Sequence, residues 1–230
     1  MNRKYFLKTV LAMSFGFVIS VKSQIPELYQ ASAIFINKYK EKILEIIKQL
    51  KNEGSSIVKK VMNGKTYVFD PSVHYPYDGG ISDHNSGYRI FFHAHRPGEY
   101  GHFHTFATDE NGDLIHLVLI SMNKQGEPVA LATVNRWVTD DKYVKSEILR
   151  KLLDKFEMNP DLFVDKRVVE FVYNTINAYK ETIYELFDER DKWIRNYVNR
   201  NYNEPFEDRE YEILSYREIN IFNEKHANRL

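Results

Sequence analysis

The sequence contains no cysteine, which excludes disulfide bonds, thiolate metal ligands and a lipid-modified cysteine anchor. Basic and acidic residues balance at 32 each, so the chain has no overall field that attracts nucleic acid or an anionic membrane surface. We therefore expect no nucleic-acid partner. Any metal site in this protein must be built from histidine, aspartate and glutamate.

No apolar run is long enough to span a membrane comfortably. Three basic residues among the first eight are followed by an apolar stretch from Val10 to Val21 and then by small and polar residues. This order is typical of a secretory signal peptide cleaved before Gln24, whereas a bilayer span needs roughly 20 residues. We expect residues 1–23 to be a signal peptide, an uncleaved anchor being the alternative. The mature protein would then be periplasmic or secreted, with no stable membrane span.

Apolar residues recur at helical spacing in two parts of the chain. Residues 24–54 predict an amphipathic helix of about seven turns that stops at Gly54. From residue 142 onward the pattern predicts two helices, the second long and open to a break. The tail from residue 204 mixes acidic and β-prone residues and either returns as a strand or lies along the surface.

Four strand-like runs lie between these helical parts, namely YRIFFHAH, HFHTFAT, DLIHLVLISM and PVALATVNRWV. Short turn-rich segments join them, which favours antiparallel neighbours. The predicted fold is α+β, with a central antiparallel four-stranded meander, an N-terminal helix and a C-terminal helical layer. Residues 55–230 form a single domain in this scheme.

Two features precede the predicted meander. Asn63-Gly64 lies between two short apolar runs and predicts a β-hairpin. Residues 70–87 contain three glycines and two prolines and predict a long loop, of a length that is often functional. This loop carries the polar residues His74, Asp78, Asp83 and His84.

The segment HAHRPGEYGHFH, residues 93–104, holds four of the eight histidines. Because strand side chains alternate, His93 and His95 share one face of their strand, and His102 and His104 share one face of the next. If His93 lies opposite His104, all four imidazoles converge, with opposed Cβ atoms about 4.5 to 5.5 Å apart. Such a cluster predicts a Zn²⁺ or Fe²⁺ site. A one-residue slip would instead move one pair to the other face.

Several neighbouring residues are candidates for chemistry or for substrate binding. Glu99 and His84 are candidate acid/base groups, and Arg96 is a candidate group for an anionic substrate. Asn135, Arg136 and Trp137 end the fourth run and can line a substrate pocket. The alternative is that Arg136 pairs with an acidic side chain such as one in EDRE, residues 207–210, while Trp137 fills the core.

The chain resembles a bacterial family classed as a domain of unknown function. The resemblance rests on HYPYDGG, FHAHRPGEYGHFHTF, GEPVALATVNRWVT and EDREYEILS, and covers about residues 65 to 220. It implies a shared domain and assigns no catalytic roles.

A second resemblance is confined to the histidine segment. Gly87, His93, His95 and Glu99 have the spacing of the start of the first cupin motif, which supplies metal ligands in a β-barrel. Phe106 stands where that motif ends in glycine, and no second cupin motif follows.

Three functions are compatible with these patterns. The first is an exported metal-dependent enzyme with hydrolytic or oxygen chemistry, in which His93, His95, His102 and His104 hold the metal. The second is a non-catalytic metal-binding, ligand-binding or structural module. The third is a metal-free histidine and arginine acid/base site for a small anionic substrate.

Overall fold

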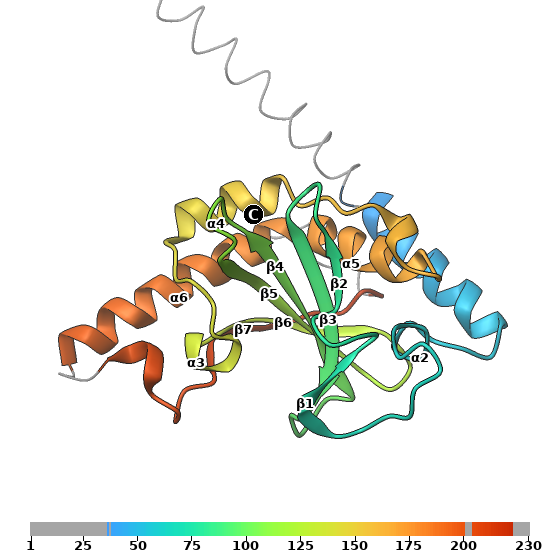
Figure 1. Ribbon diagram of the computed structural model, residues 1–230, viewed down its shortest axis with the longest axis horizontal. Helices are drawn as coiled ribbons and strands as arrows, with labels where there is room; N and C mark the ends of the chain where they lie inside the picture. The colour runs from blue at the N-terminus through green and yellow to red at the C-terminus, as the bar shows by residue number, and fades with distance from the viewer. Residues whose placement is uncertain (1–35, 37, 201–203, 223–230) are drawn as a thin grey trace, which may run out of the picture. The chain divides into compact units, whose positions relative to one another are not determined.

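Figure 1 shows the computed structural model, which describes residues 36, 38–200 and 204–222. The predicted signal peptide and the first part of the predicted N-terminal helix lie outside these residues, so both stay predictions. Residues 39–52 are helical, and a turn ends this helix at Gly54, as predicted. Within the described residues, no helix is long and apolar enough to cross a membrane.

Seven strands form one antiparallel sheet in the order β1-β3-β4-β5-β6-β7, with β2 also paired to β3. They are β1 (Asp70–Tyr75), β2 (Ile81–Asp83), β3 (Tyr88–Ala94), β4 (Gly101–Thr108), β5 (Leu114–Met122), β6 (Pro128–Val134) and β7 (Ile213–Glu218). The α+β class is therefore confirmed, but the four-stranded meander is wrong. The strand order of the described residues is also open, unlike the β-barrel that the cupin resemblance implies.

The three additional strands come from segments whose composition is not typical of strands. β1 and β2 lie in the glycine-rich stretch that was predicted to be a loop. They pair with the edge of β3 that β4 leaves free. Gly80 makes this approach possible, because a Cβ there would lie 2.2 Å from the Ile90 carbonyl oxygen. The tail returns as β7 beside β6, which was one of its two predicted alternatives.

Two further predictions of local structure are wrong. Residues before Asn63-Gly64 form helix α2 (Ile57–Val61) rather than a strand, because Ser56 caps it and its apolar side chains pack into the core. The fourth strand ends at Val134, and the next residues form helix α3 (Arg136–Thr139). Asn135 starts this helix, since its side-chain oxygen accepts the Arg136 N–H at 2.8 Å.

The C-terminal helical layer contains α4 (Ser146–Asp154), α5 (Arg167–Ala178) and α6 (Lys180–Arg200), with short 3-10 helices at Pro160–Leu162 and Pro205–Glu207. Tyr179 separates α5 from α6, so the long predicted helix is divided in two. In Figure 1 these helices lie on one side of the sheet. Among the residues that the structure describes, the opposite side has no comparable helical layer.

The two faces of the sheet carry different side chains. Phe92 and Phe103 belong to the main core, and the Phe103 ring contacts Phe171 of α5. Alternation then directs His93 and His102 away from the helices. A smaller apolar cluster built on Leu119, with Val138 of α3 against it, covers part of the histidine face.

Candidate metal centre

The pairing of β3 with β4 places His93 opposite His102 and Phe91 opposite His104. The predicted register is therefore wrong by two residues. An even shift keeps every side chain on its original face, so the predicted convergence survives. Gly101 allows the observed pairing, because a Cβ there would lie 2.4 Å from Phe92 Cζ and 2.7 Å from the His93 carbonyl oxygen.

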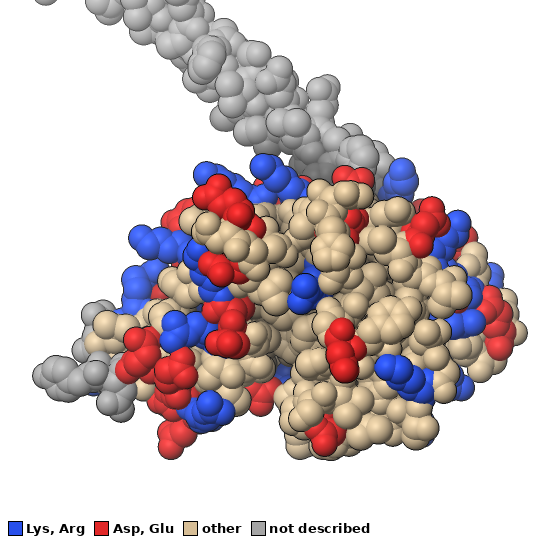
Figure 2. Space-filling model, in the orientation of Figure 1, with Lys and Arg blue, Asp and Glu red and all other residues tan. Residues whose placement is uncertain are grey.

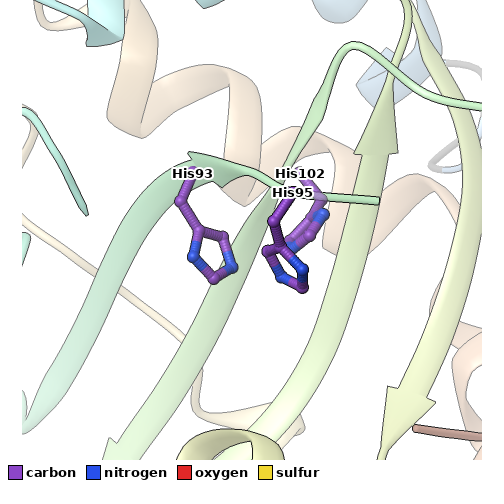
Figure 3. Close-up of side chains that lie close together, drawn as sticks. All are labelled: His93, His95 and His102. Atoms are coloured by element: carbon purple, nitrogen blue, oxygen red, sulfur yellow. The ribbon is translucent and has the colours of Figure 1, made fainter. Parts of the chain in front are cut away.

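His93, His95 and His102 form a triad in which each side chain offers a ring nitrogen within 4.8 Å of the others. His93 comes from β3, His102 from β4 and His95 from the segment just after β3. Figure 3 shows the three rings on the same side of the strands. His93 and His102 are buried, whereas His95 is half-buried, so the triad approaches solvent on the His95 side.

Hydrogen bonds orient the two buried rings of the triad. His93 Nδ1 donates to the Pro71 carbonyl oxygen at 3.3 Å, since a carbonyl can only accept. His102 Nδ1 donates to the carboxylate of Glu99. The Nε2 atoms of both rings are buried and have no hydrogen-bond partner in the described residues. Metal-binding histidines are held in this way, with one nitrogen anchored and the other free.

Burial keeps these imidazoles neutral. It lowers the pKa of His93 to about 2, with smaller contributions from His102 and His95. Burial likewise holds the pKa of His102 well below its ordinary value. A neutral imidazole is the form that binds metal. A buried nitrogen without a partner costs free energy, so the two free Nε2 atoms fit a bound ion.

His104 and His116 extend the cluster beyond the triad. The centroid of the His104 ring lies 4.9 Å from that of His93 and 4.8 Å from that of His102. Its Nδ1 lies 2.8 Å from His116 Nε2, and its own Nε2 is buried without a partner in the described residues. The backbone N–H of His116 donates to Asp141 at 3.0 Å. The β4–β5 pairing has an irregularity between His104 and Phe106, after which His116 lies opposite Phe106.

Glu99 and Arg96, both predicted catalytic residues, lie beside the triad. Glu99 is largely buried against His102, and burial raises its pKa despite the nearby Ser121 and Arg96. Arg96 lies 3.9 Å from Glu99 and 3.2 Å from Glu212. Two carboxylates thus hold the guanidinium, and these ion pairs orient Glu99 rather than point to a substrate.

The other predicted site residues lie elsewhere. His84 is exposed in the turn between β2 and β3, at the opposite end of β3 from His93. Asp83 accepts the Asn159 N–H at 2.9 Å. The described polar contacts of residues 135–137 are mostly with the C-terminal segment, where Trp137 Nε1 donates to the Tyr211 carbonyl oxygen and the Asn135 amide to neighbouring carbonyls.

The sequence allows Arg136 two alternative roles, in a substrate pocket or in an ion pair. Its guanidinium lies 2.6 Å from the carboxylate of Glu207, the first residue of EDRE. This contact matches the ion-pair alternative. The same alternative placed Trp137 in the core. Its indole N–H instead donates to the Tyr211 carbonyl oxygen at an exposed position.

Two further residues lie on β1 and β3, the strands next to the triad. His74, predicted in a loop, lies on β1 with its ring centroid 5.3 Å from that of His93. Arg89 was not predicted as a site residue at all, although it precedes Phe91 and His93 at the alternating spacing of one strand face.

A comparison with protein families matches residues 37–219 to the domain of unknown function DUF6969. The chain belongs to this family. No curated protein and no solved structure matches the chain. The family resemblance seen in the sequence is thus confirmed at the level of the domain, and the role of the triad has to be argued from its own geometry.

Proposed function

We propose that this DUF6969 protein is a metal-dependent enzyme whose ion is held by His93, His95 and His102. The observation that carries the proposal is the pair of buried, unpartnered Nε2 atoms, each on a ring anchored through Nδ1, beside a third, half-buried imidazole. Three protein nitrogens leave a coordination position open, which is the usual arrangement of a catalytic ion.

Imidazole nitrogens suit both Zn²⁺ and Fe²⁺. Bound Zn²⁺ would acidify a water molecule toward neutral pH and supply a nucleophile for hydrolysis, whereas Fe²⁺ would supply oxygen chemistry. The residues of the chain hold and orient the ion. Glu99 fixes the His102 ring, Pro71 fixes the His93 ring, and Arg96 fixes Glu99.

A structural metal site is the second candidate function, and His104 is the observation that favours it. Its buried Nε2 has no partner among the described residues, and its ring adjoins two members of the triad. Four protein ligands would close the coordination sphere and leave no place for a substrate. The metal-free acid/base alternative has less support, because an efficient acid or base has a pKa near the working pH and His93 does not.

Elemental analysis of protein purified without a metal-affinity step tests the proposal. We expect about one zinc or iron ion per wild-type chain, as a single three-histidine site requires. The double variant His93→Ala/His102→Ala should contain no metal. The matched control is His84→Ala, a substitution at an exposed position, which should retain the metal. Absence of metal in the wild type, even after incubation with Zn²⁺ and Fe²⁺, would contradict the proposal.

His104→Ala separates the enzyme from the structural site. If the triad alone holds the ion, this variant keeps the wild-type metal content. If His104 is a fourth ligand, the variant loses metal as the triad variants do. Circular dichroism of each variant checks that the helices and the sheet are intact.

A further inference from the structure

Arg89 lies on the histidine face of the sheet and forms no ion pair with any residue that the structure describes. It lies opposite Phe106 in the β3–β4 pairing, on the same face as Phe91 and His93. Its side chain is half-buried and its Nε is fully buried, yet Nε has no hydrogen-bond partner among the described residues. Arg96, beside the triad, differs because it forms ion pairs with Glu99 and Glu212, although its Nη1 is also buried without a hydrogen bond among the described residues.

An unpaired, partly buried guanidinium calls for a physical explanation. Removing its Nε donor from water without a replacement costs free energy, and a bound acceptor would offset that cost. The planar fork of arginine matches carboxylate and phosphate oxygens bidentately. An oxyanion is therefore the partner that fits the unoccupied donors of Arg89.

Aromatic surface lies between Arg89 and the triad. Phe91 is partly exposed, and its ring contacts those of His93, His104 and Phe106 at centroid distances of 5.3, 5.2 and 5.5 Å. A strand rises about 3.3 Å per residue, so the Cα atoms of Arg89 and His93 are about 13 Å apart. Figure 2 shows this side of the molecule hollowed near its centre, with much uncharged surface around the hollow.

We propose that Arg89 binds the anionic end of the substrate, a small molecule with a carboxylate or phosphate group and an apolar, planar body that lies on Phe91. The reacting end then points to the histidine triad. This assignment rests on the proposed function, since the triad supplies the second anchor. It makes Arg89 a residue that selects anionic over neutral substrates.

Two metal-binding probes that differ by one charge test the proposal. Benzohydroxamate and 4-carboxybenzohydroxamate are titrated into the zinc-loaded protein by calorimetry. We expect the carboxylate to increase the affinity of the wild type by about tenfold, the effect of one charged hydrogen-bonded pair. In Arg89→Gln the two probes should bind equally, with the metal content unchanged.

Arg195→Gln is the matched control, because it removes the same charge from an exposed position on α6. It should keep the tenfold difference. Equal affinity of the two probes for the wild type, or a difference that persists in Arg89→Gln, would overturn the assignment.

A second measurement keeps this assignment separate from the metal proposal. In a chelating buffer, benzoate should raise the thermal unfolding temperature of the wild type more than the neutral benzamide does. This preference should be lost in Arg89→Gln. If no metal binds but the preference is seen, the metal proposal fails and the anion site stands; if benzoate and benzamide act alike, the anion site fails.

Discussion

At the scale of single residues, the site is defined by which nitrogen of each imidazole is already used. In both His93 and His102, Nδ1 donates a hydrogen bond to an oxygen and Nε2 is free, although the acceptors differ. Pro71 offers a neutral carbonyl, whereas Glu99 offers a buried carboxylate. The carboxylate makes the His102 ring the more electron-rich ligand.

Glu99→Gln should weaken metal binding. The amide keeps the shape of the side chain but removes the negative charge that orients and enriches the His102 ring, so we expect the metal affinity to fall by about 10- to 100-fold. Competition with a chelator of known affinity measures the change. Glu110→Gln, at an exposed turn position, is the control, and an affinity equal to that of the wild type in both variants would refute the role of Glu99.

At the scale of elements, the β3–β4 pair decides which histidines meet. Alternation alone put all four on one face, and this could be predicted from residues 93–104. The register could not, because it depends on the steric fit of Gly101 against Phe92 and on the pairing of both strands with their outer neighbours. The predicted opposition of His93 and His104 was therefore wrong while the predicted face was right.

Gly101→Ala should damage both the fold and the site. The added methyl group meets Phe92 and the His93 backbone, and overpacking of this kind costs about 1 to 3 kcal/mol. We expect a lower free energy of unfolding in urea and weaker metal binding, since β4 must shift against β3.

Gly112→Ala is the control for this change. Its φ of 87° makes alanine unfavourable, but a Cβ there meets nothing within 4 Å. This variant should lose stability by about 1 kcal/mol and keep the metal affinity of the wild type. Loss of metal affinity in both variants, or in neither, would show that the β3–β4 contact does not control the site.

At the scale of the whole molecule, the sheet separates two environments. The helical layer packs on one face and supplies most of the apolar burial. The other face places histidines, half-exposed aromatic surface and Arg89 together. Most of its histidines are buried, so the groups of the candidate site also affect the stability of the fold.

The metal-free protein should lose stability as the pH falls below about 6.5, the ordinary pKa of histidine. Burial lowers the folded pKa of His93 to about 2. Between these values the unfolded chain binds the proton and the folded chain does not, so protonation favours unfolding. Each such histidine contributes up to about 1.4 kcal/mol per pH unit.

Urea unfolding in a chelating buffer between pH 7 and pH 5 measures this slope. His93→Gln should flatten it, whereas His84→Gln, a change at an exposed turn, should leave it as in the wild type. Equal slopes in the wild type and in His93→Gln would show that His93 is not a neutral, buried group in the folded state.

The sequence by itself determined the α+β class, the helical layer and the gathering of His93, His95, His102 and His104, because these follow from local periodicities of the chain. Only the tertiary structure decided the seven-stranded sheet, the register, the anchoring of His93 by Pro71 and the isolation of Arg89. Each of these depends on segments that are distant in sequence, such as β1 against β3 and β7 against β6. Hydrogen-bond partners and charge neighbours are set by those long-range contacts, which no local pattern encodes.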